Sequence, residues 1–236
     1  MNENKVNWVF DIDGTLTPSR GKIDEEFREY FLWFVKTHQV YLATGSDYPK
    51  TIQQIGHEIC EEVEASFNCS GNSIWVGGKE VYRTQWELEG LERDFFEQKL
   101  LESKFKPKTG LHIEDRPGMA NFSVVGRKAT FEERFLYKQW DEHKNERHQI
   151  AKEFADTFGT NIVAQVAGDT GIDIFPAGYD KSQIADRVTG AVVFFGDKMM
   201  HGGNDFPLAE KIMKRTGGRA IQVKDWKDTW KRMKEI

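Results

Sequence analysis

WVFDIDGTLTPSR, residues 8–20, joins the end of an apolar run to two carboxylates and a glycine. The apolar run Lys5–Phe10 predicts a strand. Residues two apart in an extended chain point to the same side, so Asp11 and Asp13 are expected to face one point beyond the carboxyl end of this strand. Gly14 allows the backbone to turn there. Because Asp-Gly is also a common turn sequence, the stretch by itself indicates either a turn or a reactive site.

Strand and helix patterns alternate at both ends of the chain. This alternation predicts a parallel sheet covered by helices, which is a doubly wound, Rossmann-like α/β fold. We expect the two ends of the chain to share one sheet. The predicted elements are a strand at 5–10, a helix at 24–38, a strand at 39–44, a helix at about 48–62, a strand at 191–197, a helix after 204, a strand at 220–223 and a last helix.

The middle of the chain follows a different pattern. A hairpin is predicted at 73–85, and the strands and helices after it do not alternate strictly, which indicates an inserted α+β domain. The expected division is a catalytic core at 1–83 and 178–236 and a substrate-binding cap at 84–177. The cap is expected to contain helices at about 88–103 and 131–158 and strands at 110–115, 119–127, 161–166 and 171–175.

The composition of the chain limits the kinds of molecule that it is expected to bind. The chain has 236 residues, of which 39% are hydrophobic and 30% charged, and a formal net charge of -5. This balance predicts a globular protein without the basic surface that nucleic-acid binding requires. The strand predicted from Lys5 leaves no room for a signal peptide, and no apolar run has the length of a membrane span, so we expect a cytoplasmic protein. Cys60 and Cys69 are expected to be buried, unpaired thiols.

Three further stretches carry polar groups at predicted strand or helix ends. Thr44 and Ser46 follow the second strand, where their hydroxyls could hold phosphoryl oxygens, although simple helix capping by Ser46 or its neighbour explains them equally well. Lys181 lies at a predicted helix start, where its charge opposes the helix dipole and suggests a function instead. Asp197 ends a buried strand, and Asp205 begins the next helix after a glycine-rich loop.

The order of these motifs resembles that of the haloacid dehalogenase superfamily of phosphoryl-transfer enzymes. The motifs are DxDGT, a hydroxyl residue after the second strand, a lysine, and GD followed by GGND. More closely, VFDIDGTLTPSRGKI, GMANFSVVGR, IDIFPAGYDKS and FFGDKMMHGGNDFPLAEK resemble the eukaryotic type of phosphomannomutase. The resemblance covers most of the chain and is patchy in the helices.

The resemblance implies roles for the core residues. Asp11 would be the nucleophile that becomes an aspartyl phosphate, and Asp13 the general acid and base. Ser46 and Lys181 would bind the transferring phosphoryl group. A phosphate ester repels a carboxylate nucleophile, so the site needs a cation, and oxygen ligands suit Mg²⁺. The metal residues implied are Asp11, Asp13 through its backbone carbonyl, Asp197 and, in support, Asp205.

Arginines in the predicted cap raise the question of substrate. Arg116, Arg127 and Arg134 could together grip the non-reacting phosphate of a sugar phosphate, because guanidinium groups bind phosphate in a bidentate manner. Without the resemblance, surface solubility would explain these arginines better. The resemblance assigns them to the distal phosphate and adds three substrate contacts, which are Arg20, Asn121 and Asp173.

Some positions depart from the pattern of the family. Gly171 stands where a serine is usual, so one hydroxyl donor is missing unless Thr170 replaces it, and His201 stands where proline is usual. His201 is not expected to bind the metal.

The resemblance implies interconversion of hexose 1-phosphate and hexose 6-phosphate, and dimerisation through the caps is common in the family. A sugar-phosphate phosphatase and a non-catalytic sugar-phosphate-binding protein are the alternatives.

Overall fold

The computed structural model describes residues 6–236 and divides the chain into two compact units. The first, called the core unit below, comprises Met1–Thr84 and Gly178–Ile236, and the second, the insert unit, comprises Gln85–Ala177. The first boundary lies one residue after the expected position, and the second lies at the expected position. The roles of catalytic core and substrate-binding cap remain predictions.

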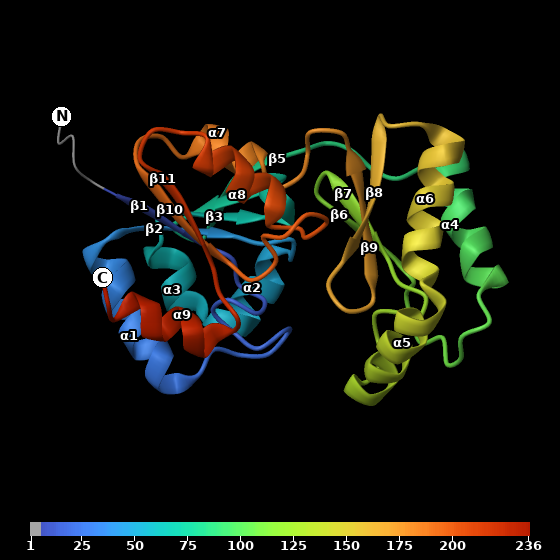
Figure 1. The fold of residues 1–236 in the computed structure, drawn as a ribbon, viewed down its shortest axis with the longest axis horizontal. Coiled ribbons are helices and arrows are strands. Elements are labelled where there is room, and N and C mark those ends of the chain that lie inside the picture. Colours follow the sequence, from blue (N-terminus) through green and yellow to red (C-terminus); the bar gives the residue numbers. More distant parts are fainter. Residues whose placement is uncertain (1–5) are drawn as a thin grey trace. The chain divides into compact units, whose positions relative to one another are not determined.

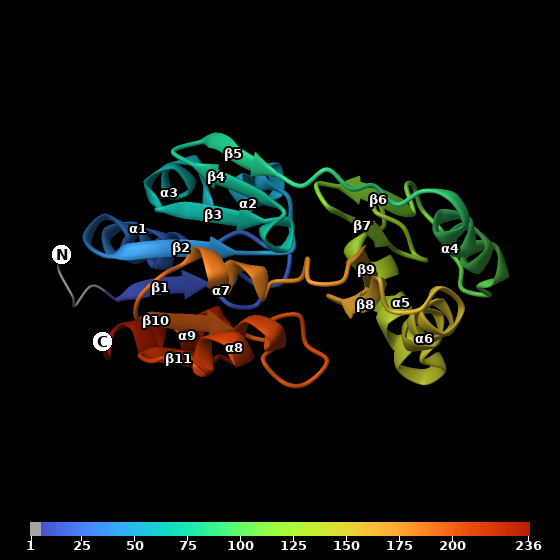
Figure 2. The same ribbon diagram turned by 90° about the horizontal axis from the view of Figure 1, so that it is seen from above.

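A seven-stranded sheet forms the middle of the core unit (Figure 2). Its order is β11-β10-β1-β2-β3-β4-β5, and the pairs from β11 to β3 are parallel. The hairpin predicted at 73–85 forms its antiparallel edge. The strands are β1 (Asn7–Phe10), β2 (Gln39–Ala43), β3 (Ala65–Asn68), β4 (Ser73–Val76), β5 (Lys79–Arg83), β10 (Val192–Gly196) and β11 (Gly218–Gln222).

Helices cover both faces of this sheet, as Figure 1 shows. Side chains alternate along β1, so that Trp8 and Phe10 pack into one apolar layer and Val9 into the other. The predicted doubly wound, Rossmann-like α/β fold is therefore confirmed. One face carries α1 (Glu25–Thr37), α2 (Tyr48–Ile55), α3 (His57–Glu62) and α9 (Trp226–Met233), and the other carries α7 (Gln183–Arg187) and α8 (Phe206–Met213).

Two local features of the core unit differ from the sequence prediction. The single helix expected at 48–62 is two helices, because Gly56 adopts a φ of 91° that ends α2. The sequence did not predict strand β3, because its polar residues interrupt the apolar pattern typical of a buried strand. Ser66 and Asn68 are buried in it and satisfied by a mutual hydrogen bond of 2.8 Å.

The insert unit is an antiparallel sheet with its helices on one face (Figure 1). Its order is β6-β7-β9-β8, and the apolar face, which includes Phe122, Ile172 and Ile174, packs against the helices. The helix expected at 131–158 is broken at Asn145, whose φ is 55°. The elements are α4 (Gly90–Glu102), β6 (Ile113–Arg116), β7 (Met119–Phe122), α5 (Phe131–Lys144), α6 (Glu146–Phe158), β8 (Ile162–Ala167) and β9 (Gly171–Pro176).

The other face of this sheet carries a row of polar residues across all four strands. Glu114 pairs with Asn121, Asn121 with Asp173, and Asp173 with Gln165. Side chains of directly paired residues lie on the same face, so the four polar groups are neighbours. Across residues 6–236, none of the helices has both the length and the apolar composition needed to cross a bilayer.

A buried ion pair ties the helices of the insert unit to its sheet. Arg147 Nε donates to Asp141 Oδ2 at 2.7 Å, and the side chain of Asp141 is 6% exposed. The same guanidinium donates to the carbonyls of Gly168 and Gly171 beside the β8–β9 turn. Loss of one member would leave the other charge buried without its partner.

We therefore expect Arg147→Ala to lower the free energy of unfolding by about 3–5 kcal/mol. Lys152→Ala is the matched control, because Lys152 on the same helix forms an exposed pair with Asp156 and should contribute under about 1 kcal/mol. Urea unfolding of both variants followed by circular dichroism measures the difference. Equal stabilities for the two variants would contradict the structural role of Arg147.

Candidate active site

The site in the core unit lies where the order of strands reverses. β1 and β10 are parallel neighbours, with Phe10 opposite Phe195. From β1 the chain continues to β2 and β3 on one side, and from β10 to β11 on the other. Open α/β sheets bind ligands at such a point, beyond the carboxyl ends of the strands. Asp11 follows β1 and Asp197 follows β10, so both carboxylates belong to this point.

Lys181 joins two of the carboxylates. Its Nζ donates to Asp11 Oδ1 at 2.6 Å and to Asp205 Oδ1 at 2.7 Å, and all three side chains are at most 4% exposed. Lys181 precedes α7, where the helix dipole disfavours a positive charge. Asp11 and Asp205 neutralise the charge of Lys181. Tertiary contacts therefore explain why a lysine lies at a helix start, where the dipole disfavours it.

The second oxygen of each paired carboxylate is also held. Thr15 Oγ1 donates to Asp11 Oδ2 at 3.3 Å, and the backbone N–H of Lys198 donates to Asp205 Oδ2 at 3.1 Å. These contacts fix the direction of both carboxylates before any ligand binds. The site is thus preorganised by neighbouring elements of the core unit.

Burial and mutual repulsion shift the ionisation of the group. Burial, followed by the charge of Asp205, raises the pKa of Asp11 well above its usual value, and Lys181 offsets only part of this. Burial raises the pKa of Asp197 to about 6, with Lys198 opposing the shift and Asp205 adding to it. Burial alone would lower the pKa of Lys181, but its two carboxylate partners outweigh that effect and raise it.

Asp11, Asp197 and Asp205 form a cluster whose oxygen atoms lie within 4.8 Å of one another. Asp197 fits there because Gly14 has no side chain, since a Cβ on Gly14 would lie 2.4 Å from Asp197 Oδ2. Within the described residues, Oδ1 of neighbouring Asn204 is buried without a hydrogen-bond partner. Crowded carboxylates and an unsatisfied oxygen are the donor set that a hydrated divalent cation prefers.

Asp13 has partners of its own. Its Oδ1 accepts hydrogen bonds from the backbone N–H of Arg20 and, at 2.9 Å, from Gln54 Nε2. Its carboxylate is not a member of the three-residue cluster found among the described residues. The acid and base role of Asp13 and the use of its backbone carbonyl by the metal remain predictions. Arg20, a predicted substrate contact, is thereby tied to the same loop by its backbone.

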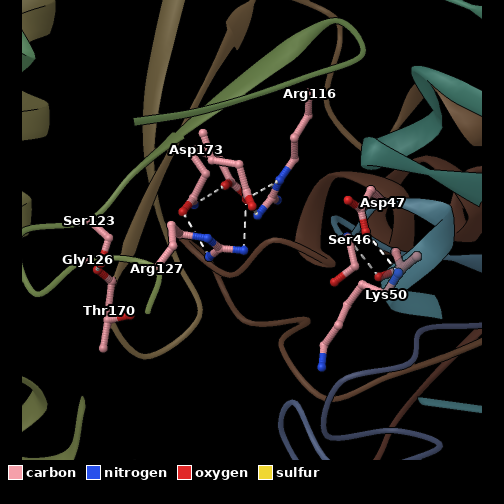
Figure 3. Close-up of polar contacts among 12 residues, drawn as sticks. Ser46, Asp47, Lys50, Arg116, Ser123, Gly126, Arg127, Thr170 and Asp173 are labelled. Atoms are coloured by element: carbon pink, nitrogen blue, oxygen red, sulfur yellow. Dashed lines mark hydrogen bonds and ion pairs between the residues drawn. The ribbon is translucent and has the colours of Figure 1, made fainter. Parts of the chain in front are cut away.

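In the loop after β2, the structure shows which residue caps the next helix. Asp47 caps α2, because its Oδ1 accepts from the backbone N–H of Lys50 at 3.0 Å (Figure 3). The backbone N–H of Ser46 donates to Thr44 Oγ1 at 3.0 Å. Of the two capping residues considered from the sequence, Asp47 therefore supplies the cap, and the hydroxyl of Ser46 is not needed for it.

In the insert unit, Arg116 and Arg127 converge on one carboxylate (Figure 3). Arg116 Nε donates to Glu114 Oε2 at 2.8 Å, and Arg127 Nη2 lies 2.8 Å from the same oxygen. The arginine side chains are 9% and 20% exposed, which rules out the surface-solubility interpretation. The two guanidinium groups form a fixed cationic pair at the edge of the polar row.

The other predicted substrate residues continue this network. Asn121 Oδ1 accepts from Arg127 Nη1 at 3.2 Å, and Asn121 Nδ2 donates to Asp173 Oδ1 at 2.7 Å. Gly171 makes room for this amide, because a Cβ on Gly171 would lie 2.7 Å from Asn121 Nδ2. A serine at position 171 would therefore require Asn121 to move.

Arg134 differs from the other two arginines. Its guanidinium donates to the carbonyls of Gly126, Arg127 and Ala129 and, at 2.9 Å, to Thr170 Oγ1. These bonds hold the loop that carries Arg127. Thr170 is 5% exposed and serves as an anchor for Arg134. Arg134 is thus placed to position Arg127, and its direct contact with phosphate remains a prediction.

Comparison with known proteins identifies the family. The family described as eukaryotic phosphomannomutase matches residues 27–236. The chain belongs to this family. The phosphomannomutase of Saccharomyces cerevisiae is 32% identical over 243 residues, which cover 97% of this chain and 92% of that protein. As a phosphomannomutase-family protein, it is a phosphoryl-transfer enzyme.

Solved structures agree on the fold of the family member. The C-terminal domain of the C. albicans trehalose-6-phosphate phosphatase has a TM-score of 0.67 at 14% identity, covering 96% of this chain and 90% of that one. A haloacid dehalogenase-like hydrolase from Bacteroides thetaiotaomicron has a TM-score of 0.61 at 15% identity, covering 92% and 88%. These likenesses show that the chain shares its overall fold with both proteins.

Sequence reasoning missed three residues that hold the site of this family member. Thr15 binds Asp11, Gln54 binds Asp13, and Glu114 binds the arginine pair. Thr15 lies within the DxDGT motif and could have been assigned from it. Gln54 carries no local signal, because its partner Asp13 is distant in the sequence. Glu114 lies two residues before Arg116 on the same strand, but its second partner, Arg127, lies on a loop whose position the sequence does not give. His201 is exposed and its ring contacts Phe206.

We expect Lys181→Met to lower the free energy of unfolding of the metal-free protein by about 3–5 kcal/mol at pH 7, because two buried carboxylates then lack their cation. Loss of the ammonium raises the pKa of Asp11 further above its unfolded value. The folded variant then binds protons that the unfolded chain does not, so its stability should recover as pH falls from 7 to 5.

Urea unfolding in EDTA between pH 5 and 8 measures this recovery. Lys211→Met is the matched control, because Lys211 forms an exposed pair with Asp186 in the same unit. A constant stability difference between Lys181→Met and the wild type across this pH range would contradict the account.

Proposed function

We propose that this protein interconverts hexose 1-phosphate and hexose 6-phosphate through a phosphoryl group carried on Asp11. The observation that carries the proposal is the fixed pair of guanidinium groups on the insert unit, in addition to the carboxylate cluster of the core unit. Hydrolysis of an ester needs one phosphate site. A mutase needs a second site for the phosphate that does not react.

In the first half-reaction, the enzyme accepts a phosphoryl group from a hexose 1,6-bisphosphate and releases a hexose monophosphate. An oxygen of the Asp11 carboxylate attacks phosphorus, an Asp11 O–P bond forms and the ester P–O bond breaks. The departing sugar oxygen takes a proton from Asp13. Asp11 suits the attack because Lys181 and Thr15 hold its carboxylate in one orientation.

In the second half-reaction, the hydroxyl at the other end of the hexose monophosphate is the nucleophile. Asp13 removes the proton of that hydroxyl, its oxygen attacks the phosphorus on Asp11, and the Asp11 O–P bond breaks. Ser46 and Lys181 would bind the oxygens of the phosphoryl group. Gln54 holds the carboxylate of Asp13 in place through both halves.

Mg²⁺ is the cation that fits the carboxylate cluster. Asp11 and Asp197 would bind it, with the backbone carbonyl of Asp13, and Asp205 would support them. When bound, Mg²⁺ supplies charge that offsets the repulsion between the phosphate ester and Asp11. Burial is the main cause of the raised pKa values of Asp11 and Asp197, and the charge of Asp205 adds to both. A bound cation would offset that negative charge.

Two alternatives share most of these residues. A sugar-phosphate phosphatase would use Asp13 to activate water against the same aspartyl phosphate, and it would have no need of the arginine pair. A non-catalytic sugar-phosphate-binding protein would have no need of Asp11, Asp13 and Lys181 together. A cytoplasmic location and a homodimer formed through the cap remain predictions of the sequence.

Phosphorus NMR tests the proposal. With Mg²⁺, mannose 1-phosphate and a trace of hexose 1,6-bisphosphate, we expect a 6-phosphate signal to grow with time. Asp11→Asn should lower the rate by at least about 10³-fold, because the nucleophile is lost. Arg127→Ala should lower kcat/KM by about 10–100-fold, because a charge-assisted contact with the distal phosphate is removed.

Arg93→Ala is the control for Arg127→Ala, because Arg93 in the same unit pairs with Asp115 at an exposed position. It should leave the rate unchanged. Removal of Mg²⁺ with EDTA should stop the reaction. Growth of inorganic phosphate in place of the 6-phosphate signal would establish the phosphatase, and unchanged rates in Asp11→Asn would refute both enzymes.

A further inference from the structure

Glu114 occupies an unusual position for an acidic residue beside a phosphate site. It lies on β6 at the end of the polar row, and its Oε2 is shared by Arg116 and Arg127. Its side chain is 28% exposed, so it is partly withdrawn from water. An incoming phosphate would need the same guanidinium groups that this carboxylate already holds.

The charges of the polar row and of the two arginines beside it balance without a ligand. Arg116 and Arg127 contribute two positive charges, and Glu114 and Asp173 contribute two negative ones. Burial would raise the pKa of Glu114, but the two guanidinium groups outweigh burial and hold that pKa below its usual value. Glu114 is therefore ionised at neutral pH. Its negative charge offsets part of the positive charge of the arginine pair when no phosphate is bound.

We propose that Glu114 is a positioning residue of the distal phosphate site, where it holds Arg116 and Arg127 in place and offsets their charge so that bound phosphate is released readily. The inference rests on the proposed mutase function. It assigns a role to a residue that touches the arginines and acts on the substrate only through them.

The chemistry of a mutase explains why ready release matters. Once a hexose monophosphate has accepted the phosphoryl group from Asp11, the sugar carries phosphate at both ends, and the distal phosphate must leave its site before the sugar can turn and present its other end. An interaction that binds substrate and transition state equally lowers KM without raising kcat. An arginine pair without Glu114 would bind the distal phosphate more tightly and would slow the exchange.

Glu114→Gln separates positioning from charge. Glutamine keeps the size of the side chain and one oxygen acceptor for the arginines, but it removes the negative charge. We expect this variant to bind inorganic phosphate about tenfold more tightly than the wild type, measured by titration calorimetry of the full chain in EDTA. In the mutase assay its KM and kcat should both fall.

Matched variants localise the effect. Asp115→Asn removes a charge from the next residue of the same strand, where Asp115 pairs with Arg93, and should change phosphate affinity by less than about twofold. Adding Arg127→Gln to Glu114→Gln should abolish the gain in affinity. Glu114→Ala is a second variant without the charge, for use if thermal unfolding shows that Glu114→Gln does not fold.

The outcomes distinguish this inference from the proposed function. Phosphate affinity that is unchanged or weaker in Glu114→Gln, or a gain that persists with Arg127→Gln, would overturn the role of Glu114. A rise in KM would show instead that Glu114 only keeps the arginines folded, and would also overturn it. Failure of the wild type to interconvert the esters would refute the mutase, while phosphate calorimetry would still report on Glu114.

Discussion

The bridge that Lys181 makes between Asp11 and Asp205 is the interaction on which the core site depends. Three charged side chains are buried together, and such a group is stable only when each charge has its partners. The bridge joins residues that follow β1, precede α7 and precede α8, so it forms only when both ends of the chain have entered one sheet. The same contact that holds the fold at this point therefore orients the proposed nucleophile.

The two units use opposite versions of one electrostatic arrangement. In the core unit an ammonium group lies between two carboxylates, and in the insert unit a carboxylate lies between two guanidinium groups. Each arrangement fixes charged groups in place before a ligand arrives, which lowers the cost of ordering them during binding. The core arrangement leaves excess negative charge that suits a divalent cation. The insert arrangement leaves one positive charge, which the carboxylate of Asp173 offsets through Asn121, and this balance suits the proposed exchange of a phosphate.

The sequence predicted the parts of the fold whose cause is local. Asp11 and Asp197 could be placed at one sheet edge because each ends an apolar strand. Asp47 was one of the two residues that the sequence offered as the cap of α2, the other being Ser46. β3 was not predicted, because Ser66 and Asn68 are polar residues in a buried strand. Their burial depends on the hydrogen bond between them, which the type of each residue alone does not reveal. The anchoring role of Arg134 and the shared carboxylate of Glu114 depend on loop positions set by tertiary packing. Motif spacing could identify the arginines but could not say which of them holds the others.

The central claim is that Asp11 carries the phosphoryl group, while Asp13, one residue further along, transfers protons. The most direct measurement is rapid acid quenching of the enzyme with hexose 1,6-bisphosphate and Mg²⁺, followed by mass spectrometry of the intact chain and of its peptides. The account predicts a gain of one phosphoryl group on Asp11 that hydroxylamine removes, as expected of an acyl phosphate. Modification of Asp13 in place of Asp11, or of neither residue during turnover, would contradict it.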